Sequence, residues 1–110
     1  MPQITVEHSA SLDRRGFARA LHPLVVETVD TTLGACKTRF REVDETVVGD
    51  GAAEEVLVHV EIALLTGRTD ALKGRLAEAV LALLPEYVKA PDGVRLSVEV
   101  RDLEASYRSR

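Results

Sequence analysis

Hydrophobic and polar positions change their spacing several times along the chain, and each spacing predicts one element. Apolar and polar residues alternate over residues 4–8, which predicts a short strand. The strand stops at residues 9–11, Ser-Ala-Ser, where hydroxyl groups favour a helix N-cap. From residue 12 to residue 29 apolar side chains recur three and four positions apart, which predicts an amphipathic helix. Pro23 lies inside this helix and predicts a kink or a local break.

A second strand and helix follow at similar spacing. Residues 37–48 are rich in Thr, Val and Phe but alternate imperfectly, which predicts a strand with a bulge before a turn at residues 49–51. Residues 56–65 alternate on both faces and predict a central strand. A further helical stripe spans residues 72–84, and Pro85 limits it.

The last strand is the clearest of the predicted elements. It follows the turn at Asp92-Gly93, with apolar residues at even positions and polar residues at odd positions over residues 94–101. The predicted order is therefore β-α-β-β-α-β in two similar halves of about 50 residues, each a right-handed crossover. Two α+β architectures share this order. One is the ferredoxin-like sandwich; the other is the tautomerase or MIF-like fold, with two helices on one face of a four-stranded sheet.

Length and composition limit the class of protein. A chain of 110 residues and 12.0 kDa predicts a single domain over residues 1–110. Its apolar stretches are too short to span a membrane, and its start lacks the basic and apolar segments of a secretory signal. A single cysteine, Cys36, fits a reducing compartment. We therefore expect a cytoplasmic protein without membrane contacts.

Charge and motifs exclude several functions. The net charge is -4 and only 4% of residues are aromatic, which argues against a nucleic-acid partner. The chain has no recognisable metal-ligand spacing, no phosphate-binding glycine loop and no nucleophile elbow. His8, His22 and His59 are scattered, and we interpret them, like Cys36, as packed or surface residues. We expect neither a metal nor a cofactor.

The start of the chain carries the remaining candidate chemistry. Pro2 follows the initiator Met1, and removal of Met1 would leave a secondary amine at the head of the first strand. Such an amine can take up and return a proton, and the rigid ring fixes the direction of its lone pair. Nearby cations and exclusion of water would lower its pKa towards neutrality.

Several segments together resemble a known family. They are residues 2–9, Pro-Gln-Ile-Thr-Val-Glu-His-Ser; residues 37–44, Lys-Thr-Arg-Phe-Arg-Glu-Val-Asp; and the pairs Asp50-Gly51, Val58-His59 and Gly67-Arg68. In order and approximate spacing they resemble the 5-carboxymethyl-2-hydroxymuconate isomerases of the tautomerase superfamily. The resemblance extends over residues 2–104, and the agreement of several weak signals in one register makes it specific.

The resemblance implies a homotrimeric isomerase that acts without metal or cofactor in the breakdown of aromatic compounds. It implies that Pro2 is the catalytic base and acid and moves a proton in a small carboxylated oxo-acid or hydroxymuconate. Arg68 matches an arginine that holds a substrate carboxylate. Lys37 stands where the family has a second arginine, and Arg39 would share its strand face if no bulge intervenes. The implied catalytic set is Pro2, Arg39 and Arg68, and the implied substrate-binding set is Lys37, Arg39 and Arg68.

One alternative comes from another class of protein. A non-catalytic oligomeric binding or regulatory module of ferredoxin-like fold would make the Met1-Pro2 start incidental. In that case Arg39 and Arg41 would be solvated strand residues paired with Glu42 or Glu45. For assembly, we expect helices on one sheet face to leave apolar surface on the other, which favours a trimer.

Overall fold

The element order is β-α-β-β-α-β, as predicted. The structure is a computed structural model and describes residues 2–110, so the predicted removal of Met1 lies outside the described residues. Two short 3-10 turns follow the helices, at Leu33–Ala35 and Leu84–Glu86. The strands and helices are β1 (Gln3–His8), α1 (Arg14–Val29), β2 (Lys37–Glu42), β3 (Leu57–Leu64), α2 (Asp70–Leu83) and β4 (Arg95–Asp102).

The strand order separates the two architectures that the sequence left open. The sheet runs β2-β1-β3-β4, with β1 parallel to β2, β3 parallel to β4, and β1 antiparallel to β3. Each helix therefore returns the chain to the strand directly beside the one it left. A ferredoxin-like sheet is built from split units, in which another strand lies between the parallel pair. The arrangement is that of the tautomerase fold, and the ferredoxin-like alternative is wrong.

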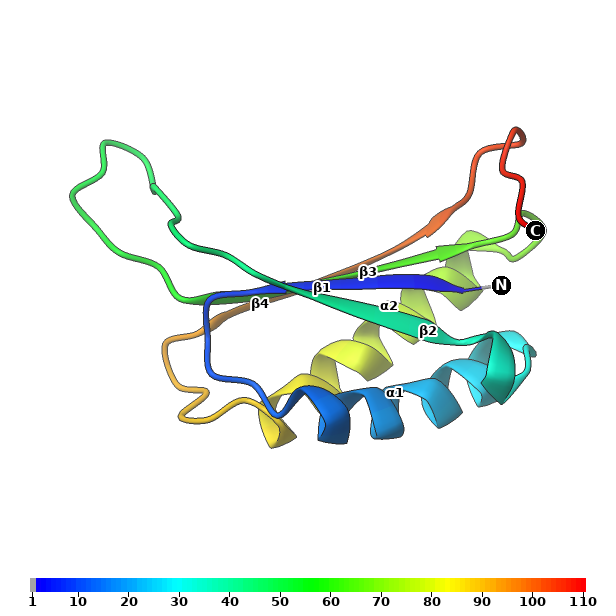
Figure 1. Ribbon diagram of the computed structural model, residues 1–110, viewed down its shortest axis with the longest axis horizontal. Coiled ribbons are helices and arrows are strands. Elements are labelled where there is room, and N and C mark those ends of the chain that lie inside the picture. Colours follow the sequence, from blue (N-terminus) through cyan, green and yellow to red (C-terminus); the bar gives the residue numbers. More distant parts are fainter. Residues whose placement is uncertain (1) are drawn as a thin grey trace.

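The core lies between the sheet and the two helices, which cover the same face (Figure 1). Even-numbered residues of β1 and β3 face the helices, because strand side chains alternate between faces. Burial of each such apolar side chain stabilises the fold by about 1.5–3 kcal/mol. The fully buried side chains include Ile4, Val6, Phe17, Leu21, Val25, Val58, Val60, Ile62, Leu76 and Val80. Within residues 2–110, no helix has the length and apolarity that a bilayer crossing demands.

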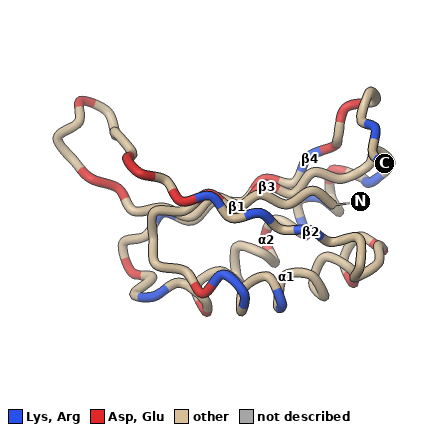
Figure 2. The backbone as a smooth tube through the Cα atoms, viewed as in Figure 1, with Lys and Arg blue, Asp and Glu red and all other residues tan. Residues whose placement is uncertain are grey.

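The sheet face away from the helices is polar, and our expectation of exposed apolar surface there is wrong. Figure 2 marks the charged positions along the strands. The large apolar side chains that are exposed lie outside this face, in loops, in the 3-10 turn and on α2. We call this surface the open face. Its polar residues are Gln3, Thr5, Glu7, Lys37, Arg39, Arg41, His59, Glu61, Arg95, Ser97, Glu99 and Arg101, and its apolar residues are Leu57 and Ala63.

The first helix begins later than the predicted cap. Asp13 is the N-cap of α1, and its Oδ1 accepts a hydrogen bond from the Gly16 amide at 3.1 Å. The hydroxyl of Ser9 instead accepts from the amide of Leu57 at 3.0 Å. Residues 11–13 cannot join the helix because they are bonded to residues 87–89. The cap predicted at residues 9–11 is therefore wrong.

Pro23 does not break α1, which continues from Arg14 to Val29. Proline removes one amide donor, here the one that would bond the carbonyl of Arg19. Both Pro23 and Arg19 are exposed, so that carbonyl is open to solvent and its loss of an amide partner costs little. The predicted local break is wrong for this reason.

The segment after β2 is an arm rather than a bulged strand. β2 ends at Glu42 with a regular register against β1. β1 ends at His8, so the chain beyond Val43 has no neighbouring strand to pair with. Residues 43–56, which we call the arm, leave the sheet and return (Figure 1, green). The turn predicted at residues 49–51 is confirmed, with Gly49 and Gly51 at φ 55° and 84°.

Candidate active site at the Pro2 end of the sheet

Pro2 stands immediately before β1, and it is buried. β1 is one of the two central strands, so this position has β2 on one side and β3 on the other. The start of β2, the end of β3 and the end of β4 all meet there, because Gln3 pairs with Lys37 and with Ala63, and Leu64 pairs with Asp102. Figure 1 shows the two chain ends together on this side. We call it the Pro2 end.

Arg68 reaches the Pro2 end from the loop after β3. Its Nη2 and Nε donate to the carbonyl of Val29 at 2.9 and 3.3 Å, and its Nη1 donates to the carbonyl of Leu65 at 3.3 Å. Val29 ends α1, where unpaired carbonyls form the negative end of the helix dipole and attract a cation. These contacts use three of the five N–H donors of the guanidinium. Two donors are left for a ligand.

Arg39 and Lys37 lie on the open face at the start of β2. Their registers, Lys37 with Gln3 and Arg39 with Thr5, contain no bulge, so the prediction that they share a face is confirmed. Both side chains are exposed. None of the salt bridges found within residues 2–110 involves either residue. Their charges are therefore available to an anionic ligand, and the pairing with Glu42 considered for Arg39 does not occur.

Two residues that the sequence analysis missed connect to Arg39. Arg39 Nη1 donates to Gln3 Oε1 at 2.9 Å, and Gln3 Nε2 donates to Tyr107 Oη at 3.0 Å. Gln3 adjoins Pro2, whereas Tyr107 lies 104 positions further along the chain. No spacing rule links residues so far apart. The only signal was the position of Gln3, between Pro2 and Ile4 on the first strand.

The second helix is also fixed at this end. Thr69 caps α2 by accepting from the Leu72 amide at 3.1 Å. Lys73 bonds Asp102 of β4 at 3.1 Å and Asp70 at 3.3 Å. The hydrogen bond to Asp102 is the main cause that raises the pKa of Lys73 above its ordinary value. Lys73 is thus a charged link between α2 and β4, and its charge is already paired with carboxylates.

One chain brings the candidate residues to the same end but in two groups. Pro2 has the parity of Ile4 and Val6, which face the helices, and Arg68 contacts the end of α1 on that side. Lys37 and Arg39 lie on the open face. The strand pairings and the contact of Arg68 with Val29 therefore bring these residues to one end of the sheet, on its two sides.

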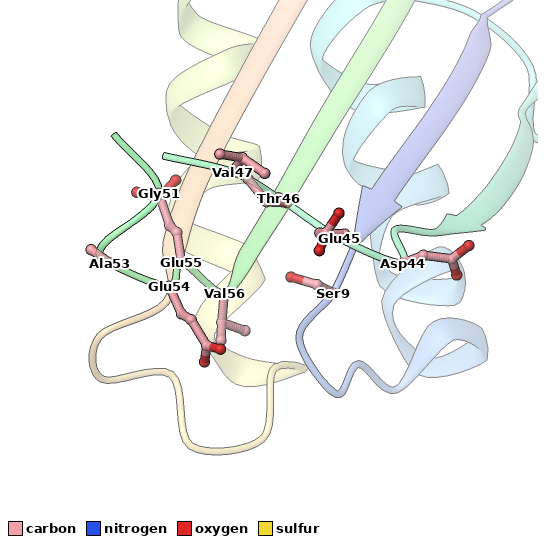
Figure 3. A pocket seen from close by; sticks show the side chains of 10 residues that line it. All are labelled: Ser9, Asp44, Glu45, Thr46, Val47, Gly51, Ala53, Glu54, Glu55 and Val56. Atoms are coloured by element: carbon pink, nitrogen blue, oxygen red, sulfur yellow. The ribbon is translucent and has the colours of Figure 1, made fainter. Parts of the chain in front are cut away.

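Two cavities within residues 2–110 lie away from Pro2. One of about 410 Å³ is at the opposite end of the sheet, where the arm folds opposite Ser9 (Figure 3). Its charged lining is entirely acidic: Asp44, Glu45, Glu54 and Glu55. That charge disfavours a carboxylate ligand. Within residues 2–110, no three His, Cys, Asp or Glu side chains are placed to hold a metal ion. A smaller cavity of about 300 Å³ lies on the open face around His59.

The histidines and the cysteine are packed or surface residues, as predicted. His8 is buried. Its Nε2 accepts a hydrogen bond from Arg14 Nε at 3.1 Å, and its Nδ1 lies 2.9 Å from the carbonyl oxygen of Ala10. His59 Nδ1 lies 2.6 Å from Ser97 Oγ on the open face. Cys36 is buried just before β2, and burial raises the pKa of its thiol. A raised pKa disfavours the thiolate that a nucleophilic role would need.

The third histidine leads to a prediction about acid stability. Burial lowers the pKa of His22, whose Nε2 lies 2.7 Å from Thr38 Oγ1 of β2. The unfolded chain then binds a proton that the folded chain resists, so the free energy of unfolding decreases as the pH falls below about 6.5. We expect His22→Gln, which keeps a hydrogen-bonding group, to lose less thermal stability than the wild type between about pH 7.5 and about pH 5. His59→Gln is the control, and equal acid sensitivity in the wild type and His22→Gln would contradict the prediction.

The fold defines a class. Two helices on one face of a β2-β1-β3-β4 sheet are the arrangement of the tautomerase or MIF-like fold. The family model of 5-carboxymethyl-2-hydroxymuconate isomerase matches residues 2–110. The chain belongs to this family, as the resemblance of its sequence indicated, and is an isomerase.

Solved structures agree on the fold. The chain is similar to a 5-carboxymethyl-2-hydroxymuconate isomerase from Deinococcus radiodurans R1, with a TM-score of 0.82 and 20% identity over 99% of this chain and 88% of that one. It is also similar to a macrophage migration inhibitory factor-like protein from Entamoeba histolytica, with a TM-score of 0.74 and 14% identity over 99% of this chain and 94% of that one. A third similar structure is a fused 4-OT described as a symmetric trimer, with a TM-score of 0.77 and 17% identity over 97% of this chain and 92% of that one. No curated protein sequence matches the chain.

Proposed function

We propose that the chain, after removal of Met1, isomerises small carboxylated oxo-acids of the hydroxymuconate type by proton transfer through the Pro2 amine, without metal or cofactor. The observation that carries this proposal is the position of Pro2. It is buried at the head of a central strand, with Lys37, Arg39 and Arg68 on the segments that surround it. Membership of the isomerase family supports the reaction type.

The proposed reaction is a transfer within one molecule. The lone pair of the Pro2 nitrogen removes the enol proton of a hydroxymuconate, or the allylic proton of its unconjugated oxo form, and the electrons remain in the conjugated system as a dienolate. A cation close to the carbonyl oxygen stabilises the charge that develops there. The protonated amine then returns the proton to a carbon of the dienolate, so no atom or electron is gained or lost. The base must be neutral before the reaction and protonated during it.

The surroundings of Pro2 favour the neutral amine at the start. Burial disfavours the charged form of an amine, and neighbouring cations do the same through like-charge repulsion. Pro2 is buried, and Lys37 pairs with Gln3, the residue next to it. Both influences would lower the pKa of the free amine towards neutral pH, where it can accept a proton and give it back.

The three cations fit a substrate with more than one carboxylate. Arg68 has two N–H donors left after its backbone contacts, and Arg39 has four left after its bond to Gln3. Lys37 supplies a charge without the planar two-point contact of an arginine. We therefore assign carboxylate binding to Arg39 and Arg68. To Lys37 we assign an electrostatic role, in which its positive charge attracts the anionic substrate and lowers the pKa of the Pro2 amine.

We propose that the active unit is a homotrimer. The two groups of candidate residues lie at one edge of the chain, one on the helix side of the sheet and one on the open face. A second copy packed against this edge would complete the surroundings of the substrate. Leu33 and Leu65, exposed by 59% and 47% near the Pro2 end, give apolar surface for such a contact. The open face would meet another subunit through paired charges rather than through apolar packing.

Light scattering tests the assembly. We expect the chain to scatter as a trimer at micromolar concentration. Replacing Leu65 by Glu places a charge in the apolar contact and should shift the population to monomer, with a parallel loss of isomerase activity. Leu81→Glu, on the exposed side of α2, is the matched control and should leave the trimer intact. A wild-type monomer with full activity would contradict the shared site.

The activity itself is tested with matched substrates. We expect the chain to convert 2-hydroxymuconate to its conjugated oxo isomer, followed by the change in ultraviolet absorbance. The dimethyl ester has the same carbon skeleton and no charge, so a strong preference for the free acid is expected from the cations. A chain with free Pro2 that converts neither compound above the solution rate would contradict the proposed function.

A further inference from the structure

The C-terminal segment is connected to Arg39 by a chain of hydrogen bonds across the open face. The chain runs from Arg39 Nη1 to Gln3 Oε1 at 2.9 Å, and from Gln3 Nε2 to Tyr107 Oη at 3.0 Å. Leu103 donates to the Leu64 carbonyl, and Tyr107 closes a turn by donating its amide to the Glu104 carbonyl at 2.9 Å. The segment after β4 is thereby folded back so that Tyr107 meets the residue next to Pro2.

These bonds have only one consistent direction. A guanidinium can donate but cannot accept, so the Gln3 oxygen must face Arg39. The amide nitrogen of Gln3 must then face Tyr107, whose oxygen accepts. If the amide turned over, its NH2 group would face the guanidinium and the bond to Arg39 would be lost, whereas the Tyr107 hydroxyl could donate to the Gln3 oxygen instead. Arg39 therefore sets the orientation of the amide, and Tyr107 anchors the other side of the Gln3 side chain.

We propose that Tyr107 is a positioning residue that acts through Gln3 to hold Arg39 in place for a substrate carboxylate; this inference rests on the proposed function. The bond to Gln3 uses one N–H of Nη1. It leaves the edge formed by Nε and Nη2 free for the two oxygens of a carboxylate. The relay thus aligns the arginine without occupying the edge that a ligand would use.

Alignment matters here because Arg39 is exposed. A long exposed side chain samples many rotamers, and it loses this freedom when it binds a ligand. Gln3 and Tyr107 are both half-buried, so they are less free to move than the arginine. Holding the guanidinium in advance removes part of the entropic cost of binding, and this improvement applies to the binding of charged substrate more than to the chemical step.

Replacement of one hydroxyl tests the relay. We expect Tyr107→Phe to raise KM for 2-hydroxymuconate about threefold to tenfold, which is the range for loss of one hydrogen bond, and to leave kcat nearly unchanged. KM for the dimethyl ester should not move. Tyr87→Phe makes the same chemical change beside Phe17, away from the relay, and should alter neither value. Equal effects on both substrates would overturn the proposal.

A double-mutant cycle separates positioning from general structure. In an Arg39→Ala background, Tyr107→Phe should cause no further rise in KM, because the group that it positions is absent. Gln3→Met removes both bonds at nearly constant shape, and adding Tyr107→Phe to it should also change little. Additive effects in either background would overturn the relay. If Arg39→Ala leaves KM unchanged, the role of Arg39 and the relay are both wrong, while the proline mechanism is unaffected.

Binding of an unreactive ligand distinguishes failure of the relay from failure of the proposed function. Muconate has two carboxylates and no enol, so calorimetric titration measures its affinity without turnover. We expect Tyr107→Phe to weaken muconate binding about threefold to tenfold, and Tyr87→Phe to leave it unchanged. A wild type that binds muconate but isomerises nothing would contradict the proposed function alone. Unchanged muconate affinity in Tyr107→Phe, or no binding by the wild type, would overturn the relay.

Discussion

A chain whose Pro2 nitrogen is blocked should lose almost all isomerase activity. Extension of the chain by a short peptide before Pro2 turns the amine into an amide, which has no basic lone pair. General base catalysis contributes about 100-fold to 10,000-fold, so kcat/KM should fall by that factor. Pro2→Ala keeps a free primary amine at the same strand and should retain part of the activity. The measurement is the rate of 2-hydroxymuconate isomerisation, combined with the intact mass of each chain.

The pH profile tests the same atom independently. If the Pro2 amine is the base, kcat/KM should rise with pH as the amine loses its proton in the free enzyme. Lys37→Ala and Arg39→Ala each remove a positive charge near the Pro2 end, so they should stabilise the protonated amine. The rising limb should then move to higher pH. Arg19→Ala, on the exposed side of α1, is a control for general charge change and should not move it.

The outcome that contradicts the proline mechanism is equally clear. A blocked chain with an unchanged thermal midpoint and the full isomerisation rate would show that another group is the base. If the rising limb keeps its position in Lys37→Ala and Arg39→Ala, Pro2 can still be the base. These two cations would then not contribute to the lowered pKa of the Pro2 amine.

The sequence was sufficient for elements whose pattern has a local physical cause. The alternation of residues 94–101 reflects one buried and one open sheet face, and β4 forms there. The prediction of a strand over residues 37–48 failed beyond Glu42 because a strand needs a neighbour to pair with. β1 ends at His8, so the chain beyond β2 has no strand to bond. The helix N-cap predicted at residues 9–11 failed for a similar reason, since the hydroxyl of Ser9 accepts a hydrogen bond from the amide of Leu57 on another strand.

The candidate site was predictable only as far as the resemblance reached. Pro2, Arg39 and Arg68 come to one end of the sheet because the parallel and antiparallel pairings bring the segments that carry them together. Gln3 and Tyr107 could not be found in this way, because their contact depends on how the chain turns after β4. The backbone contacts of Arg68 were also hidden, since the end of α1 is 39 positions away.

Arg68 should show the second large effect, because the same guanidinium has two roles. Arg68→Ala removes a charge-assisted contact to a substrate carboxylate, so kcat/KM for 2-hydroxymuconate should fall about 10-fold to 100-fold. The same variant removes two donors to the Val29 carbonyl at the negative end of α1 and one donor to the Leu65 carbonyl after β3. The free energy of unfolding should therefore decrease by about 1–2 kcal/mol. Arg75→Ala, exposed on α2, is the control and should change neither quantity.

The two roles of Arg68 can be separated by substrate and by charge. The dimethyl ester has no carboxylate, so its kcat/KM should fall much less in Arg68→Ala than that of the free acid. Arg68→Lys keeps the cation near the end of α1 and should recover most of the stability. It loses the planar grip on two oxygens, so the recovery of activity on the free acid should be smaller. Equal losses for acid and ester in Arg68→Ala, measured well below the unfolding midpoint, would limit Arg68 to holding the end of α1.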